Sequence, residues 1–130
     1  MPKDYQLILK EIPTAKRAKS LTITKIAEIE GQNLLEAVPK NNLVIALDEH
    51  GKEWTTHELA KKISTWHLEQ QDISLLIGGP DGLAKDLLKT VPIIWSLSKL
   101  TLPHQLVRVV VAEQIYRAWS IINNHPYHRD

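Results

Sequence analysis

Apolar residues follow two patterns along this chain, short continuous runs and longer stretches with helical spacing. The runs at 43–48, 73–78 and 92–98 are typical of strands covered on both faces. The segment YQLILKEI at 5–12 predicts one more strand near the N-terminus. Helical spacing predicts helices at 23–38, from Thr55 or Thr56 to Gln71, around 83–89 and over 105–122. Strands alternating with helices indicate an α/β fold with a mostly parallel sheet and flanking helices.

The last expected helix differs from the others because it is apolar nearly all round. Arg108, Glu113 and Arg117 are its only charged residues. A helix of this kind needs two surfaces to pack on. In so short a chain we expect one surface to be the sheet and the other to be a second subunit. Glu113 and Arg117 stand four residues apart, which predicts an ion pair on one side of the helix.

Composition narrows the class of protein. We interpret residues 1–130 as one domain, because the length suits one domain and no repeat, low-complexity segment or linker interrupts the pattern. The absence of cysteine excludes a disulfide framework and a cysteine zinc site, and the histidines show no metal-ligand spacing. The N-terminus lacks a signal-like apolar run, and no segment approaches about 18 consecutive apolar residues. These features favour a cytoplasmic protein with no membrane partner and no metal.

Three of the five glycines lie within the segment 78–82, which reads GGPDG and follows a predicted strand. Ligands of open α/β sheets bind outside the carboxyl ends of the strands. The segment has no G-x-G-x-x-G pattern and no following Lys-Ser or Lys-Thr, which excludes the dinucleotide fingerprint and the P-loop. Taken alone, the segment is interpreted as a tight turn between a strand and a helix.

Four blocks in order give the chain a family resemblance. They are LD at 47–48, LLIGGPDG at 75–82, WSLSKLTLPHQLVRVVVAEQIYRAW at 95–119 and NHPYHR at 124–129. Together they resemble the ribosomal RNA large subunit methyltransferase H family, the pseudouridine N3-methyltransferases of the SPOUT superfamily. The similarity extends over essentially the whole chain.

The resemblance implies a homodimer with a SPOUT-type C-terminal trefoil knot, whose loops bind S-adenosylmethionine in a bent shape. Matching family positions gives the cofactor-binding residues Leu47, Gly78, Leu97, Ser98, Lys99, Leu100, Thr101 and Leu102. By this matching, backbone groups of 97–102 hold the adenine edge, and leucines form apolar walls. A Cβ atom at Gly78 is expected to obstruct the cofactor.

The implied reaction is methylation of N3 of a pseudouridine in large-subunit (23S) ribosomal RNA. The matching tail supplies the catalytic candidates Tyr127, His128 and Arg129. His128 would accept or relay the N3 proton, although a group that only positions N3 is the alternative. Arg129 would steady the ring oxygens or a phosphate, and Tyr127 would orient the base. The basic segment at 15–19 is a further candidate contact with ribosomal RNA phosphates.

One departure from the family leaves two functions open. Family members carry about one strand and one helix before the position that matches Met1, so we expect a domain shortened at its N-terminus. The chain is then either an active ribosomal RNA methyltransferase or a non-catalytic dimeric relative that binds cofactor or RNA. A generic α/β nucleotide-binding protein is a third interpretation, and it predicts ATP binding.

Overall fold

Strands and helices alternate through the part of the chain that the computed structural model describes, residues 22–79 and 82–129. In chain order the elements are α1 (Ile23–Ala37), β1 (Leu43–Glu53), α2 (Thr56–Leu68), β2 (Ile73–Leu76), α3 (Lys85–Thr90), β3 (Ile93–Ser96) and α4 (His104–Ile122). The strand predicted at 5–12 and the basic segment at 15–19 lie outside the described residues.

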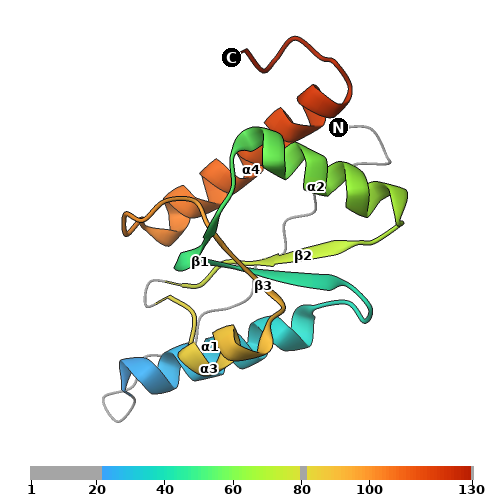
Figure 1. The fold of residues 1–130 in the computed structure, drawn as a ribbon. Helices are drawn as coiled ribbons and strands as arrows, with labels where there is room; N and C mark the ends of the chain where they lie inside the picture. Colours follow the sequence, from blue (N-terminus) through green and yellow to red (C-terminus); the bar gives the residue numbers. More distant parts are fainter. Residues whose placement is uncertain (1–21, 80–81, 130) are drawn as a thin grey trace.

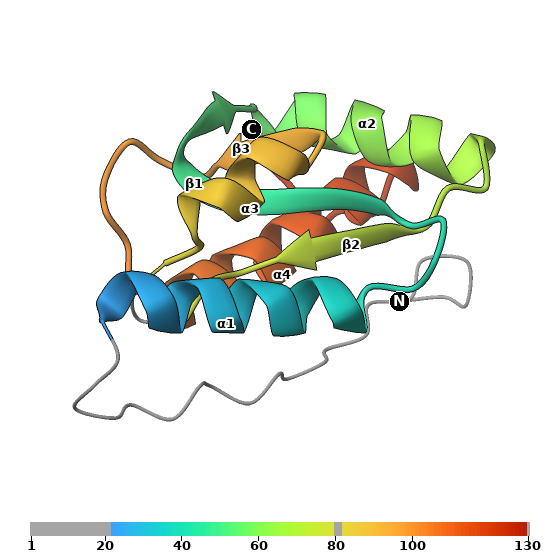
Figure 2. The ribbon, with the colours of Figure 1, turned by 90° about the horizontal axis from the view of Figure 1, so that it is seen from below.

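The described strands form a parallel sheet in the order β2-β1-β3. Helices α2 and α4 cover one face of this sheet, and α1 and α3 cover the other (Figures 1 and 2). The prediction of a parallel α/β sheet with flanking helices is therefore confirmed. The trefoil knot is not visible in the described residues, and it stays an implication of the family.

The helix starts follow from local capping. The Thr22 hydroxyl accepts a hydrogen bond from the backbone N–H of Lys25 at 3.1 Å and caps α1. Of the two caps considered for α2, Thr55 is the one used, and it forms a capping box with Glu58. Helix α2 ends at Leu68, before the predicted Gln71, because the chain turns at Gln70 with a positive φ of 55°.

Strand β1 is longer than predicted, and its additional part contains Gly51. The sequence pattern predicted a strand ending at residue 48, whereas β1 continues to Glu53 after a register shift between Leu47 and Lys52. A Cβ atom at Gly51 would lie 2.6 Å from the carbonyl oxygen of Ile94. Glycine therefore allows the irregular part of β1 to press against β3.

Two apolar clusters hold the helices to the two faces. The larger cluster lies between the sheet and helices α2 and α4, and its buried residues are Ile45, Leu47, Leu59, Ala60, Trp95, Val111 and Ala118. The smaller cluster joins α1 and α3 to the other face through Leu76, Ala84 and Leu87. Successive side chains of β1 point alternately toward the larger and the smaller cluster, because neighbouring side chains of a strand lie on opposite faces.

Helix α4 finds both of its packing surfaces partly inside the chain. It lies on the larger cluster and packs alongside α2, so α2 supplies part of the second surface, and the second subunit expected from the sequence stays a prediction. Leu106 and Val109 of α4 nevertheless remain 45% and 65% exposed. In the described part of the chain, every helix is too short or too polar to cross a membrane.

Candidate functional site

The parallel register brings the predicted cofactor segments to one edge of the sheet. Leu47 is aligned with Trp95 of β3, and its neighbour Ala46 is aligned with Leu76 of β2. Gly78 therefore leaves β2 at the level where 97–102 leaves β3, beside Leu47. Figures 1 and 2 show both segments at the same end of the sheet. This edge, consisting of Leu47, the turn at 78–82 and the loop at 97–102, is called the strand-end edge.

Hydrogen bonds hold the loop at 97–102 in one shape. The Ser96 hydroxyl donates to the carbonyl oxygen of Ser98 at 2.8 Å, and the Ser98 hydroxyl accepts from the N–H of Leu100 at 3.0 Å. The Thr101 hydroxyl donates to the Glu49 carboxylate at 2.6 Å and ties the loop to β1. Such ties reduce the ordering cost of binding a ligand through backbone groups.

The side chains of the predicted apolar wall lie in different environments. Leu47 is 8% exposed and belongs to the larger core cluster, whereas Leu97 and Leu102 are half-buried. Leu100 is 70% exposed, and Lys99 is also exposed. Leu97 and Leu102 therefore have apolar surface at this edge, whereas the Leu47 side chain packs into the core.

The turn's own backbone requires glycine at position 78, which is a different reason from the cofactor contact that the resemblance implied. A Cβ atom at Gly78 would lie 2.6 Å from the backbone carbon of Gly82 and 2.8 Å from the nitrogen of Leu83. The turn closes on itself, with the N–H of Gly82 donating to the carbonyl of Gly79 at 2.9 Å. Gly82 has a φ of 76°, which suits glycine. The turn's own backbone therefore excludes a side chain at Gly78, whatever a cofactor requires.

A buried acid beside this turn was missed in the sequence. Glu30 of α1 is 7% exposed, and its Oε1 atom is buried without a hydrogen-bond partner in the described part of the chain. Its Oε2 atom lies 2.5 Å from the position that a Cβ at Gly79 would take. The available signal was spacing, because Glu30 stands four residues after Ile26 and four before Leu34 on an apolar stripe.

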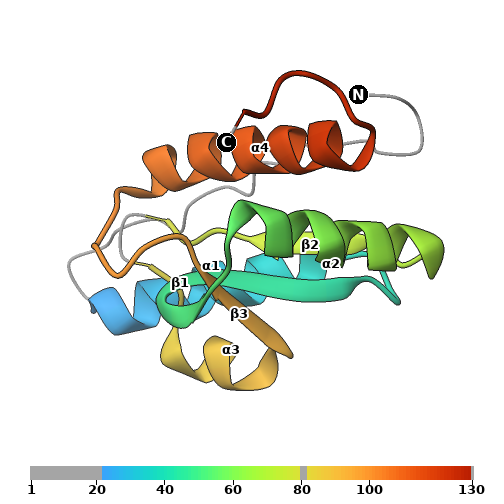
Figure 3. The ribbon, with the colours of Figure 1, turned by 45° about the horizontal axis from the view of Figure 1, so that its top comes forward.

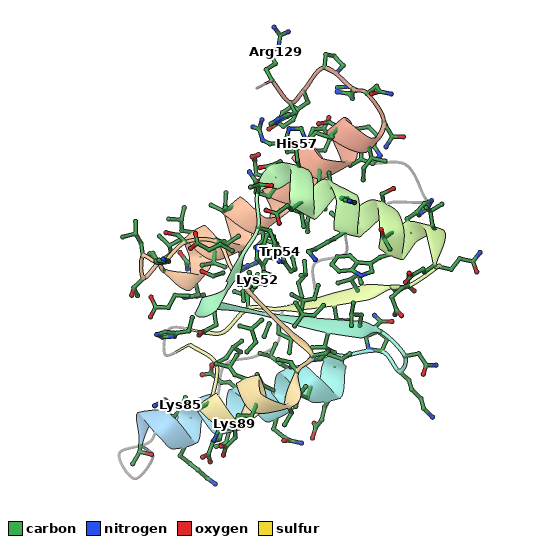
Figure 4. The ribbon with its side chains drawn as sticks, viewed as in Figure 1. Lys52, Trp54, His57, Lys85, Lys89 and Arg129 are labelled. Carbon is green, nitrogen blue, oxygen red and sulfur yellow. The ribbon has the colours of Figure 1, made fainter. Side chains whose placement is uncertain are left out.

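A separate pocket of about 290 Å³ lies between the end of β1, the start of α2 and helix α4. Its lining residues are Trp54, Thr55, Thr56, Leu59, Trp95, Leu97, Val110 and Gln114. Trp54 stacks on Trp95 with ring centroids 5.1 Å apart, and Figure 4 shows Trp54 between the sheet and the helices. The volume of this pocket lies just below the range of roughly 300–1,000 Å³ for ligand sites. It shares only Leu97 with the predicted cofactor set.

The predicted catalytic residues lie on the tail after α4. His128 Nδ1 lies 3.1 Å from Nη1 of Arg117, and its ring meets that of His57 edge-on with centroids 5.3 Å apart. The Arg117 guanidinium lies 4.9 Å from the centre of the Tyr127 ring. Arg129 is exposed and points away from the rest of the molecule (Figure 4).

Electrostatics at the tail come from the predicted ion pair. Arg117 Nε donates to Glu113 Oε1 at 2.6 Å, which confirms the pair expected from their spacing. This hydrogen bond raises the pKa of Arg117 above its usual value, so the guanidinium under Tyr127 stays charged. No cluster of three or more histidine and carboxylate side chains suited to a metal ion occurs among the described residues.

One chain does not bring its tail to its own strand-end edge. Helix α4 starts directly after the loop at 97–102, and the tail begins where α4 ends. Nineteen helical residues span roughly 28 Å at 1.5 Å per residue. In Figure 3 the tail leaves the far end of α4 and folds back along the helix, whereas the loop lies at the other end. Tyr127 and His128 contact Arg117, so they lie roughly 20 Å along α4 from the loop, at 1.5 Å per residue from His104.

Comparison with known proteins agrees with this geometry. The family described as "Predicted SPOUT methyltransferase" matches residues 1–128. Ribosomal RNA large subunit methyltransferase H of Thioalkalivibrio sulfidiphilus is 49% identical over 130 residues, which cover 100% of this chain and 83% of that protein. The match includes the glycine turn, the loop at 97–102 and nearly all of the tail. The chain therefore belongs to the SPOUT methyltransferase family and is of the ribosomal RNA large subunit methyltransferase H type.

Proposed function

We propose that this protein transfers a methyl group from S-adenosylmethionine to N3 of a pseudouridine in large-subunit ribosomal RNA. The observation that carries the proposal is the strand-end edge, where three segments far apart in the sequence converge at the carboxyl ends of parallel strands. A 49% identical relative carries the name of a ribosomal RNA large subunit methyltransferase. Ribosomal RNA as the substrate also favours a cytoplasmic location.

The residues of the strand-end edge fit a cofactor that is held mainly by backbone groups. The turn at 78–82 leaves little side-chain bulk, and the loop at 97–102 is already held by its own hydrogen bonds. In this proposal Leu97 and Leu102 supply apolar contact, and Ser98, Lys99, Leu100 and Thr101 supply backbone donors and acceptors. The cofactor supplies an activated methyl group when it is bound, and the protein supplies position and electrostatics.

The tail supplies the groups that face the base. N3 of the pseudouridine must lose its proton, and negative charge develops on the ring oxygens as it does so. Arg129 holds that charge or a neighbouring phosphate, because its guanidinium is exposed and always protonated. His128 takes or relays the proton, and Tyr127 orients the ring by stacking or by its hydroxyl group.

A homodimer completes the site in this proposal. Tyr127 and His128 contact Arg117, roughly 20 Å along α4 from the strand-end edge of their own chain, and in this proposal they act on the edge of a second copy. The exposed Leu106 and Val109 give α4 an apolar surface for that copy. A two-fold dimer would form two equivalent sites, each with the edge of one protomer and the tail of its partner. The family knot shapes the loop in the same proposal, with residues 1–130 acting as one domain.

The test is transfer of labelled methyl groups to ribosomes that lack the pseudouridine methylation, with fully modified ribosomes as the control. We expect label in large-subunit RNA of the unmodified ribosomes only, and its position at N3 is read by mass spectrometry of the digested RNA. S-adenosylhomocysteine binding is measured in parallel by calorimetry. Binding without label transfer would support the non-catalytic relative instead, and tighter ATP binding would support a generic nucleotide-binding protein.

A further inference from the structure

Glu30 is the most unusual charged residue of the described chain. Its side chain points from the middle of α1 toward the glycine turn, and only 7% of the residue is exposed. Among the described residues no hydrogen bond reaches its buried Oε1 atom, and no ion pair involves the carboxylate. Lys25, by contrast, pairs with the exposed Glu28 on the same helix at 3.7 Å. The charge of Glu30 is therefore not balanced within the described chain.

A carboxylate taken out of water needs a donor or a cation nearby, because burial of an unpaired charge is strongly unfavourable. Unsatisfied buried polar groups are rare in native proteins, and those that remain require an explanation. A glutamine or a leucine at this position would fit the apolar stripe of α1 without that cost. The buried acid therefore points to a positively charged partner that the described residues do not supply.

The position of the acid identifies which ligand this partner belongs to. The Glu30 carboxylate occupies the space beside Gly79 that any side chain at that position would fill. Gly79 belongs to the turn that begins at Gly78, one of the predicted cofactor contacts. The acid consequently lies against the strand-end edge from the α1 side, opposite the loop at 97–102, which approaches from β3.

We propose that the Glu30 carboxylate binds the amino group of the amino-acid part of the S-adenosyl cofactor. This inference rests on the proposed function. The cofactor has two cationic groups, a sulfonium and an ammonium. The sulfonium loses its charge during methyl transfer, so a carboxylate beside it would stabilise the ground state more than the transition state. The ammonium keeps its charge throughout, and a carboxylate partner for it strengthens binding without slowing the transfer.

The assignment is tested by removing the amino-acid part from the ligand and the charge from Glu30. Calorimetry measures the affinity of S-adenosylhomocysteine, which has the ammonium, and of 5′-methylthioadenosine, which lacks the amino-acid part. We expect Glu30→Gln to weaken S-adenosylhomocysteine binding roughly 10- to 100-fold, as for loss of a charge-assisted hydrogen bond. Binding of 5′-methylthioadenosine should stay unchanged, which also shows that the variant is folded. Glu36→Gln is the matched control, an exposed acid on the same helix, and should change neither affinity.

Three outcomes would overturn the assignment. An equal loss of both ligands in Glu30→Gln would show that Glu30 only supports the fold of the turn. A larger loss for S-adenosylmethionine than for S-adenosylhomocysteine would place the carboxylate at the sulfonium instead. Unchanged S-adenosylhomocysteine affinity would exclude any ligand contact. If the wild-type protein binds neither ligand, the proposed function itself fails, and this result is distinct from the other three.

Discussion

The strand-end edge and the C-terminal tail are positioned by different physical means. At the edge, backbone pairing between parallel strands brings Leu47 level with the ends of β2 and β3. The tail is held instead by ring contacts on its own helix, including Tyr116 against Tyr127 at 4.7 Å between centroids. Sheet register fixes the first region within one chain, whereas the tail is placed by side chains at the end of α4. The edge can therefore form within one chain, whereas the tail is held against Arg117, part of the way along α4 from the edge.

The two regions also differ in charge. The buried acid Glu30 and the Glu49 carboxylate, which is bonded to Thr101, lie beside the edge, and the loop itself carries the exposed Lys99. Arg129 is on the tail, and the guanidinium of Arg117 on α4, paired with Glu113, lies against it. An acidic edge suits a cationic cofactor, and a basic tail suits a phosphate-rich RNA. In a two-fold dimer the two regions would meet and accept their ligands from opposite sides.

Mixing two defective variants gives the largest expected effect. Arg129→Ala alters the tail and should lower methyl transfer about 100-fold, the cost of one charge-stabilising donor. Leu102→Arg places a cation on the loop and should abolish S-adenosylhomocysteine binding. Refolding an equal mixture of the two should restore about a quarter of the wild-type rate, because half of the dimers are mixed and each holds one intact site. The rate is measured with labelled methyl groups on unmodified ribosomes.

Control variants distinguish a site formed by two subunits from a site formed within one chain. Arg129→Ala alone should keep its S-adenosylhomocysteine affinity within about twofold, since only the transfer step uses the tail. Lys89→Ala removes an exposed cation on α3, on the opposite face of the sheet, and should leave the rate near wild type (Figure 4). Mixed dimers that form and stay inactive would show that tail and edge do not combine across subunits. An equal loss of rate and affinity in Arg129→Ala would remove Arg129 from the chemical step.

Sequence reasoning located the elements of the edge but not all of their reasons. The apolar runs predicted β1, β2 and β3 because buried parallel strands need apolar side chains on both faces. The order of the strands is set by long-range pairing, which leaves no local signal. Gly78 was singled out correctly as a position for glycine, but the group that excludes a side chain is the backbone of Gly82. Only the folded turn brings these two residues together.

The burial of Glu30 and the placement of the tail could not be predicted from the sequence pattern. An acid on an apolar stripe is visible in the sequence, but its burial depends on how α1 packs against the glycine turn. The tail residues were selected by family resemblance, since a short polar segment at a terminus has no periodicity to interpret. The length of α4 was predicted closely by the apolar pattern at 105–122, but the return of the tail along the helix to Arg117 was not. The homodimer that the resemblance implies stays a prediction.

A smaller effect is expected from loosening the strand-end edge without removing it. Thr101→Val keeps the shape of the side chain and removes its hydrogen bond to Glu49. The loop at 97–102 should then sample more conformations, and S-adenosylhomocysteine affinity should fall roughly three- to tenfold, as for loss of one modest hydrogen bond. Thr90→Val, which removes a hydroxyl bond to the Leu87 carbonyl on α3, is the control and should not change affinity. Unchanged affinity in Thr101→Val would show that the loop does not depend on this tie.

The smallest effect is expected from the cap of α2, which precedes the His57 that contacts His128. Thr55→Ala removes the hydroxyl half of the capping box and should lower the free energy of unfolding by about 1 kcal/mol in urea titrations, with little change in cofactor affinity. The backbone N–H of Thr55 lowers the pKa of Glu58 below its usual value. A lowered carboxyl pKa contributes stability above the unfolded-state value, about 4.3, and that contribution is lost as the pH falls through the folded-state value. Thr55→Ala keeps this backbone N–H, so Glu58→Gln tests that half of the box, and its stability difference from wild type should shrink below about pH 4. A difference that stays constant down to pH 3 would show that the Glu58 half of the box adds nothing.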